Sequence, residues 1–132
     1  EWYQNDLIIW SGSMKEPVQV DKYCYDVDIL PTISNLLGLE YDSRLMVGQD
    51  ILSDSEQLVC FPNRSFISGK CIYNAVNGSV TPLTDEEVTQ EYLDQMSAVV
   101  YDKFSVSEMV LHENYYQYLD GHISFKSDEK SN

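Results

Sequence analysis

Residues 25–39 read Tyr-Asp-Val-Asp-Ile-Leu-Pro-Thr-Ile-Ser-Asn-Leu-Leu-Gly-Leu, and both ends of a helix are marked in this stretch. Asp28 can serve as the N-cap residue, and Pro31 then falls in the first turn, where backbone N–H groups have no partner within the helix. Gly38 follows the last apolar pair and can adopt the left-handed conformation that ends a helix. The stretch therefore predicts a short amphipathic helix that packs against a sheet. Its apolar face consists of Ile29, Ile33, Leu36 and Leu37.

Two carboxylates at the start of this helix, Asp26 and Asp28, raise the question of catalysis. Side chains two residues apart do not share a helical face, and a helix N-terminus attracts carboxylates without any catalytic purpose. Acid–base or metal chemistry needs convergent groups with perturbed pKa values. We therefore interpret both aspartates as structural.

The size and charge of the chain limit its function classes. Its 132 residues are enough for one domain, which we expect over residues 1–119, followed by a polar tail over 120–132. The start without methionine is interpreted as the edge of a piece of a longer chain. A net charge of −14 repels phosphate backbones and anionic membranes, which argues against nucleic-acid binding. No apolar run reaches the roughly 20 residues that span a bilayer, so we expect no membrane insertion by this segment.

The cysteines and histidines give no pattern of a catalytic or metal site. Cys24, Cys60 and Cys71 are odd in number and lack metal-ligand spacing, so zinc is set aside. A disulfide between Cys60 and Cys71 and buried free thiols both stay open. His112 and His122 have no Ser, Cys or Asp partner in the local sequence, and we expect both to be solvated. The acidic run 85–87 lacks the spacing of a calcium loop. The sequence therefore predicts no catalytic, cofactor-binding or metal residue.

Several segments predict strands. Leu7-Ile-Ile-Trp10 is a continuous apolar run, typical of a strand buried on both faces of a parallel or mixed sheet. Residues 58–61 and 65–68 predict short strands around a turn at 62–64. Residues 70–76 and 79–81 predict a hairpin about Asn77-Gly78, the strongest short hairpin signal. Asn63-Arg-Ser and Asn77-Gly-Ser also fit the glycosylation pattern, but turn roles account for both asparagines.

The remainder predicts helices that brace the sheet. Thr84-Asp-Glu-Glu87 is a capping box, so a helix is expected to begin at Asp85. A second box at 105–108 predicts either two helices or one helix bent near Ser105. The tyrosines at 115, 116 and 118 are expected to pack on the core rather than to meet a partner. The apolar stripe of the first helix consists of Val88, Tyr92, Met96, Val99, Val100 and Phe104.

The order of these motifs, with Met46-Val-Gly-Gln-Asp-Ile-Leu-Ser53 after the first helix and Phe61-Pro-Asn-Arg-Ser-Phe-Ile-Ser68 beyond it, resembles the final portion of lipoteichoic acid synthase-like proteins. These belong to the sulfatase and alkaline phosphatase superfamily, and the match covers about residues 5–119. The resemblance implies an extracellular α/β domain tethered by membrane helices. It also implies a threonine nucleophile and a divalent cation, typically manganese, that transfer glycerol phosphate from phosphatidylglycerol to a polymer. Related members hydrolyse sulfate or phosphate esters.

The nucleophile and metal ligands of that family precede the matched region, and no residue of this chain corresponds to them. The resemblance thus implies an α/β fold class, as an α+β fragment at the end of a sulfatase-like domain, that is inactive alone. Its partner would be the upstream part of its own catalytic domain, and residues 1–40 would expose apolar surface when separated. The alternative is a non-catalytic acidic interaction module at a bacterial surface, with a homodimer through the Leu7 edge strand.

Overall fold

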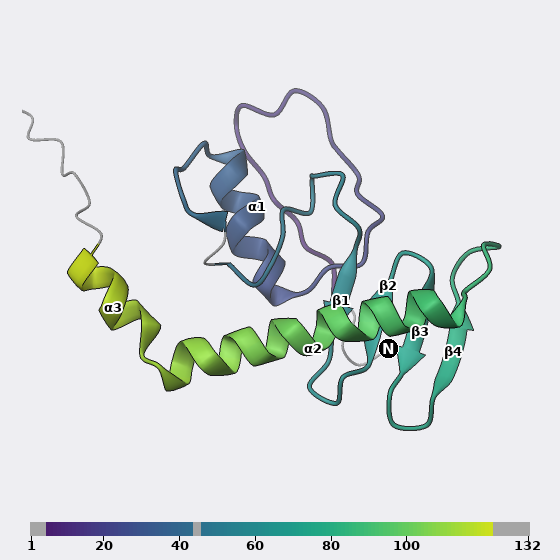
Figure 1. The fold of residues 1–132 in the computed structure, drawn as a ribbon. Helices are drawn as coiled ribbons and strands as arrows, with labels where there is room; N and C mark the ends of the chain where they lie inside the picture. Colours follow the sequence, from purple (N-terminus) through teal and green to yellow (C-terminus); the bar gives the residue numbers. More distant parts are fainter. Residues whose placement is uncertain (1–4, 44–45, 123–132) are drawn as a thin grey trace, which may run out of the picture.

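The computed structural model describes residues 5–43 and 46–122, and it shows an α+β fold in which one long helix crosses a small antiparallel sheet (Figure 1). A second, shorter helix lies beside this unit, at the end of a long loop that holds residues 5–25. The elements are η1 (Asp26–Asp28), α1 (Ile29–Leu36), β1 (Leu58–Cys60), β2 (Phe66–Ser68), β3 (Cys71–Asn74), β4 (Ser79–Pro82), α2 (Gln90–His112) and α3 (Tyr115–His122).

The predicted strands after residue 57 are confirmed. They pair in the order β1-β2-β3-β4, with every neighbouring pair antiparallel. In both turns an asparagine side chain accepts a backbone N–H two residues on, from Ser65 to Asn63 and from Ser79 to Asn77, each at 3.0 Å. The second hairpin closes at the Asn74–Ser79 pair, so its loop has four residues, and Gly78 ends it with φ +70°.

The strand order decides the question of the disulfide. Cys60 pairs with Phe66 on β2, and Phe66 pairs with Tyr73 on β3, so a whole strand separates Cys60 from the strand that holds Cys71. Two strand spacings amount to about 9–10 Å, which exceeds the Cα separation of about 7 Å that a disulfide can bridge. All three cysteines are free, with Cys71 buried and Cys24 exposed.

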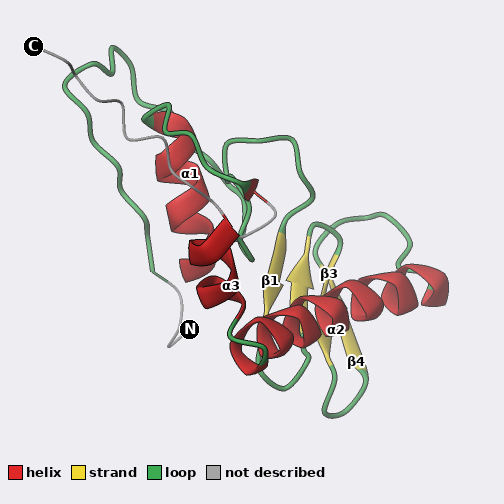
Figure 2. Cartoon of the chain, turned by 60° about the vertical axis from the view of Figure 1, so that its left-hand side comes forward, coloured by secondary structure: helices red, strands yellow, loops and turns green. Residues whose placement is uncertain are grey.

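The hydrophobic core lies between the sheet and the first half of α2 (Figure 2). The predicted helical stripe is largely confirmed, since Met96 and Val100 are buried and Val88, Tyr92 and Phe104 pack against them. Val99 is 43% exposed, and Leu93 is buried in its place. The buried members of the core are Leu58, Phe66, Cys71, Leu93, Met96 and Val100.

The predicted start of the long helix is wrong by five residues. The capping residue is Thr89, whose hydroxyl accepts the N–H of Tyr92 at 3.2 Å. The box at Thr84 does not start a helix because the chain there still belongs to the hairpin: Leu83 N–H donates to the Lys70 carbonyl at 2.8 Å. Lys70 also pairs with Glu86 at 2.6 Å and holds this loop beside the sheet.

The C-terminal region forms two helices, which is one of the two predicted arrangements. The break between them lies at Asn114 and not at Ser105. Asn114 adopts φ +50°, a left-handed conformation that asparagine tolerates and that ends α2. α2 continues without a break through Ser105. The Ser107 hydroxyl donates to the Lys103 carbonyl of the same helix at 3.0 Å. α3 then includes residues 120–122 of the predicted tail; the rest of that tail lies outside the described residues.

Two further predictions of burial are wrong. Leu7–Trp10 forms no strand, and Ile8 and Trp10 are 86% and 84% exposed. Each described strand of the sheet comes from residues 58–82, so no strand lies beside this run to pair with it. The tyrosines of α3 do not join the core: Tyr116 and Tyr118 are 57% and 58% exposed. Within the described chain, the helices are too short or too polar to cross a membrane.

Candidate functional site

Buried polar groups connect two segments of the chain. One segment is η1 with α1, and the other is the loop 46–53. The Asp28 side chain is 2% exposed. One of its carboxylate oxygens accepts the Gln49 N–H at 2.9 Å, and the other accepts the Tyr25 N–H at 3.1 Å. Asp28 therefore stands at the predicted N-cap position but does not cap α1 with its side chain. Its charge ties the loop to the helix start instead.

Thr32 makes the second connection. Its hydroxyl donates to the Asp28 carbonyl at 2.6 Å and accepts the Ile51 N–H at 3.0 Å. Asn35, one turn further along α1, donates to the Asp50 carboxylate at 2.8 Å. We call this set of bonds the polar clasp: Asp28, Thr32 and Asn35 on the helix side, and residues 49–51 on the loop side.

Gly48 lets the loop come close enough for the clasp to form. A Cβ atom on this residue would lie 1.9 Å from the Val27 carbonyl oxygen and 2.8 Å from the Asp28 nitrogen. No side chain fits between two backbones at that distance. The glycine of the Gly-Gln-Asp-Ile segment is thus required by close approach.

Asp50 shapes the loop beyond the clasp. Its carboxylate accepts the Leu52 N–H at 2.9 Å, and its carbonyl accepts the Ser53 N–H at 3.1 Å. The Gln49 side chain donates to the Glu56 carbonyl at 2.7 Å, which joins the loop to the segment before β1. The acidic and amide side chains of this segment are used to build a turn.

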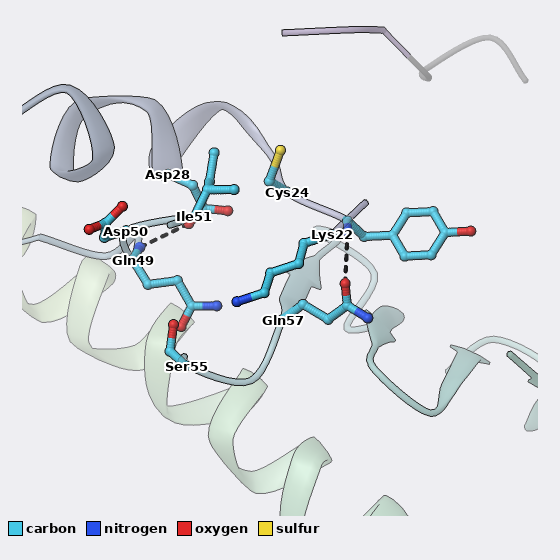
Figure 3. A pocket seen from close by; sticks show the side chains of 9 residues that line it. Lys22, Cys24, Asp28, Gln49, Asp50, Ile51, Ser55 and Gln57 are labelled. Atoms are coloured by element: carbon cyan, nitrogen blue, oxygen red, sulfur yellow. Dashed lines mark hydrogen bonds between the residues drawn. The ribbon is translucent and has the colours of Figure 1, made fainter. Parts of the chain in front are cut away.

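A small hollow lies next to the clasp, between residues 22–24 and the loop (Figure 3). Its volume is about 10 Å³, which is about the room that one water molecule needs. Groups at its rim are already engaged: Tyr23 N–H donates to the Gln57 side chain at 2.8 Å, and the Lys22 ammonium donates to the Ser53 carbonyl. In this chain the hollow does not admit a substrate.

The reactive groups near the clasp are made less reactive by their surroundings. Although Cys24 is exposed as a residue, partial desolvation of its thiol, and secondly the charge of Asp28, raises the pKa of that thiol. Burial also raises the pKa of the Cys60 thiol, and it raises the pKa of Tyr25, whose hydroxyl lies against that thiol. A nucleophilic thiol needs a lowered pKa, so these groups do not form an activated site.

The residues that the sequence suggested for chemistry do not converge. Asp28 is buried in the clasp, whereas Asp26 is exposed. The His112 side chain is 83% exposed, as predicted, and lies 3.3 Å from Glu113; the side chain of His122 is outside the described part. Within residues 5–43 and 46–118, the His, Cys, Asp and Glu side chains form no group of three or more that could hold a metal ion.

The clasp residues Thr32, Gly48 and Gln49 were not predicted. A general signal for Thr32 was present, because a polar residue of a helix needs a hydrogen-bonding partner when it is buried. Neither the partner nor the close approach at Gly48 can be read from spacing, since both depend on a loop that returns about 20 residues later. The clasp is a structural site: it holds two segments in place and presents no free reactive group.

Comparison with known proteins shows what the chain as a whole is similar to. The chain is similar to lipoteichoic acid synthase 2 of Bacillus subtilis (strain 168), with 33% identity over 96 residues that cover 70% of this chain and 14% of that protein. It is also similar to the lipoteichoic acid synthase of Staphylococcus saprophyticus, with 35% identity over 86 residues, or 59% of this chain and 13% of that protein. The chain thus spans about a seventh of these relatives. No protein-family model and no solved structure gives a match.

Proposed function

We propose, from the premise that this chain is a lipoteichoic acid synthase-like carboxy-terminal portion, that it is a structural segment of an extracellular enzyme of the sulfatase superfamily. The parent would be a bacterial, membrane-anchored enzyme that transfers glycerol phosphate, or a related hydrolase of sulfate or phosphate esters. The segment itself would supply no catalytic group. Its role would be to complete the fold of the catalytic domain.

The polar clasp is the observation that supports a structural role for this chain. Its buried carboxylate and hydroxyl are both occupied by backbone groups of the same chain, and every buried side-chain nitrogen or oxygen of the described residues has a partner. Polar groups that are fully satisfied inside a fold stabilise that fold, whereas catalytic groups must be free to meet a substrate. The motif shared in pattern with the synthases is thus used for architecture.

The family resemblance implies a divalent cation, typically manganese. In this proposal the cation would be bound by the upstream part of the catalytic domain. The described residues do not fit it on their own, because their acidic and histidine side chains do not gather into a ligand set. In this proposal no step of the reaction is assigned to a described residue of this chain. Its own contribution would be to position the elements that hold the reaction site.

Metal-dependent release of glycerol phosphate, or of sulfate from model esters, tests the proposal with two forms of the protein. One is this chain alone, and the other is the same chain extended upstream through its full extracellular domain. We expect activity with Mn²⁺ in the longer form only. A circular dichroism spectrum of the short form controls for its folding. Activity in the short form would contradict the proposal, and inactivity of both would favour the acidic interaction module.

A further inference from the structure

The loop between β3 and β4 contains a reactive backbone unit, Asn77-Gly78, and both of its residues are exposed. The backbone nitrogen of the residue after an asparagine can attack the side-chain carbonyl carbon, because the two atoms can close a five-membered succinimide ring. A side chain on that next residue crowds the ring closure, and glycine has none. Asn77 is the one asparagine of the sequence that precedes a glycine.

The hydrogen bonds of the loop hold the Asn77 side chain beside the backbone that follows it. Its Oδ1 atom accepts the Ser79 N–H at 3.0 Å, in the turn geometry that asparagine favours. This bond also draws electron density from the side-chain carbonyl, which makes the Cγ atom more electrophilic. A Cβ atom built on Gly78 would meet nothing within 4 Å, so the space around the attacking nitrogen is open.

One hydrogen bond slows the attack. The Gly78 N–H donates to the Asn74 carbonyl at 2.8 Å, and the nitrogen must give up this proton in order to form the ring. An exposed loop opens locally at a much lower free energy than the whole fold does. We therefore expect the reaction to proceed in the folded chain, through opening of the loop alone.

The turn between β1 and β2 repeats this geometry with a different residue after the asparagine. The Asn63 Oδ1 atom accepts the Ser65 N–H at 3.0 Å. Arg64 adopts φ +67°, and its N–H donates to the Phe61 carbonyl at 2.9 Å. Asn63 is exposed, as Asn77 is. The two turns thus provide a matched pair, in which an arginine side chain takes the place of the glycine hydrogen.

We propose that Asn77 is a site of spontaneous covalent modification, at which the chain converts this asparagine into aspartate and isoaspartate. The Gly78 nitrogen bonds to Asn77 Cγ and loses its proton, the bond between Cγ and Nδ2 breaks, and Nδ2 leaves as ammonia. Water then adds to one carbonyl carbon of the succinimide and opens the ring to a carboxylate. Addition at Cγ gives aspartate, and addition at the main-chain carbonyl gives isoaspartate. The reaction needs only water and is independent of the proposed function.

The isoaspartate product would loosen the edge of the sheet. It adds one methylene group to the main chain inside the loop that the Asn74–Ser79 pair closes. β4 is an edge strand that pairs with β3 alone, and Val80 packs against the hydrophobic core. The isolated isoaspartate form should therefore unfold at a lower urea concentration than Asn77→Asp, which carries the same charge on an unchanged main chain. Equal midpoints would contradict this loosening.

Peptide mass spectrometry after incubation of the folded chain in mildly alkaline buffer tests the modification. Digestion at acid pH prevents further reaction, and chromatography separates the aspartate and isoaspartate peptides, which have equal mass. We expect conversion at Asn77 at least about 10-fold faster than at Asn63, because a small difference in activation free energy multiplies the rate. No conversion at Asn77, or equal rates at the two asparagines, would overturn the proposal.

Two substitutions exchange the residue after each asparagine. Gly78→Ala should slow conversion at Asn77 at least about 10-fold. Arg64→Gly should start the reaction at Asn63, since glycine adopts the φ of Arg64 without strain. Far-UV circular dichroism confirms that each variant is folded, and the two results are independent, so either one decides if the other variant does not fold. An unchanged rate at the neighbouring asparagine in a folded variant would contradict the proposal.

Discussion

At the scale of single residues, the clasp shows why a helix can be fixed by its polar side. Asp28 receives two backbone N–H groups, and Thr32 both donates and accepts, so the burial of these polar groups is compensated. A buried polar group without such partners would cost about 1–3 kcal/mol. The compensation depends on the loop lying directly on the helix start, and therefore on Gly48.

Replacing Gly48 by alanine should destabilise the chain by at least about 2 kcal/mol, because the new methyl group meets backbone atoms that can move only if the loop leaves the clasp. The measurement is urea unfolding followed by far-UV circular dichroism, since Trp10 is too exposed to report on folding by fluorescence. Gly69→Ala is the matched control: its Cβ would lie 3.4 Å from the flexible end of Gln57. Equal midpoints for the two variants would refute the close-approach argument.

At the scale of elements, the sequence could predict those strands and helix ends whose turn or cap residues act locally. The strands around 62–64 and the hairpin were predictable because asparagine and glycine specify their turns locally. The end of α1 was predictable for the same reason: Gly38 has φ +65°. The start of α2 was not, because Thr84 and Thr89 both suit an N-cap, and only the long-range pairing of Leu83 with Lys70 selects the second.

The two threonines therefore give a direct test of the helix start. Thr89→Ala should lower the free energy of unfolding by about 1 kcal/mol, because the N–H of Tyr92 loses its acceptor. Thr84→Ala should cost much less, since the Thr84 hydroxyl only receives a weak bond from Glu86 N–H at 3.4 Å in an exposed loop. Urea unfolding of both variants measures this difference. A larger loss for Thr84→Ala would mean that the helix begins at Asp85 after all.

At the scale of the whole molecule, the sequence could predict the class of fold but not where its apolar segments would lie. Leu7–Trp10 has the composition of a buried strand, and α1 has an apolar face, yet Trp10 and Leu37 are exposed here. The apolar composition of a segment indicates that its side chains need to be buried. It does not indicate which part of the chain buries them. The clasp was equally hidden, because its contacts join residues that lie about 20 positions apart.

The stability of the whole fold should fall in alkaline solution. Burial, and secondly a 2.6 Å hydrogen bond to Glu56, raises the pKa of Tyr92 to about 12, whereas an unfolded tyrosine titrates near about 10. Between these values the unfolded chain has lost a proton that the folded chain keeps, so the contribution of Tyr92 is complete below pH ~10 and is lost as the pH rises through ~12. The burial of Tyr25 acts in the same direction.

Urea unfolding of the chain and of Tyr92→Phe at several pH values from about 9 to about 12 isolates this contribution, because phenylalanine keeps the ring and has no proton to lose. The two stability curves should converge as the pH rises, since only the unsubstituted chain carries the hydroxyl whose ionisation favours unfolding. Other groups that titrate in this range and make no contact with Tyr92, such as Tyr25, affect both proteins alike and cancel in the difference. Parallel curves would mean that Tyr92 titrates equally in the folded and unfolded chains, and that its bond to Glu56 does not link α2 to the segment before β1.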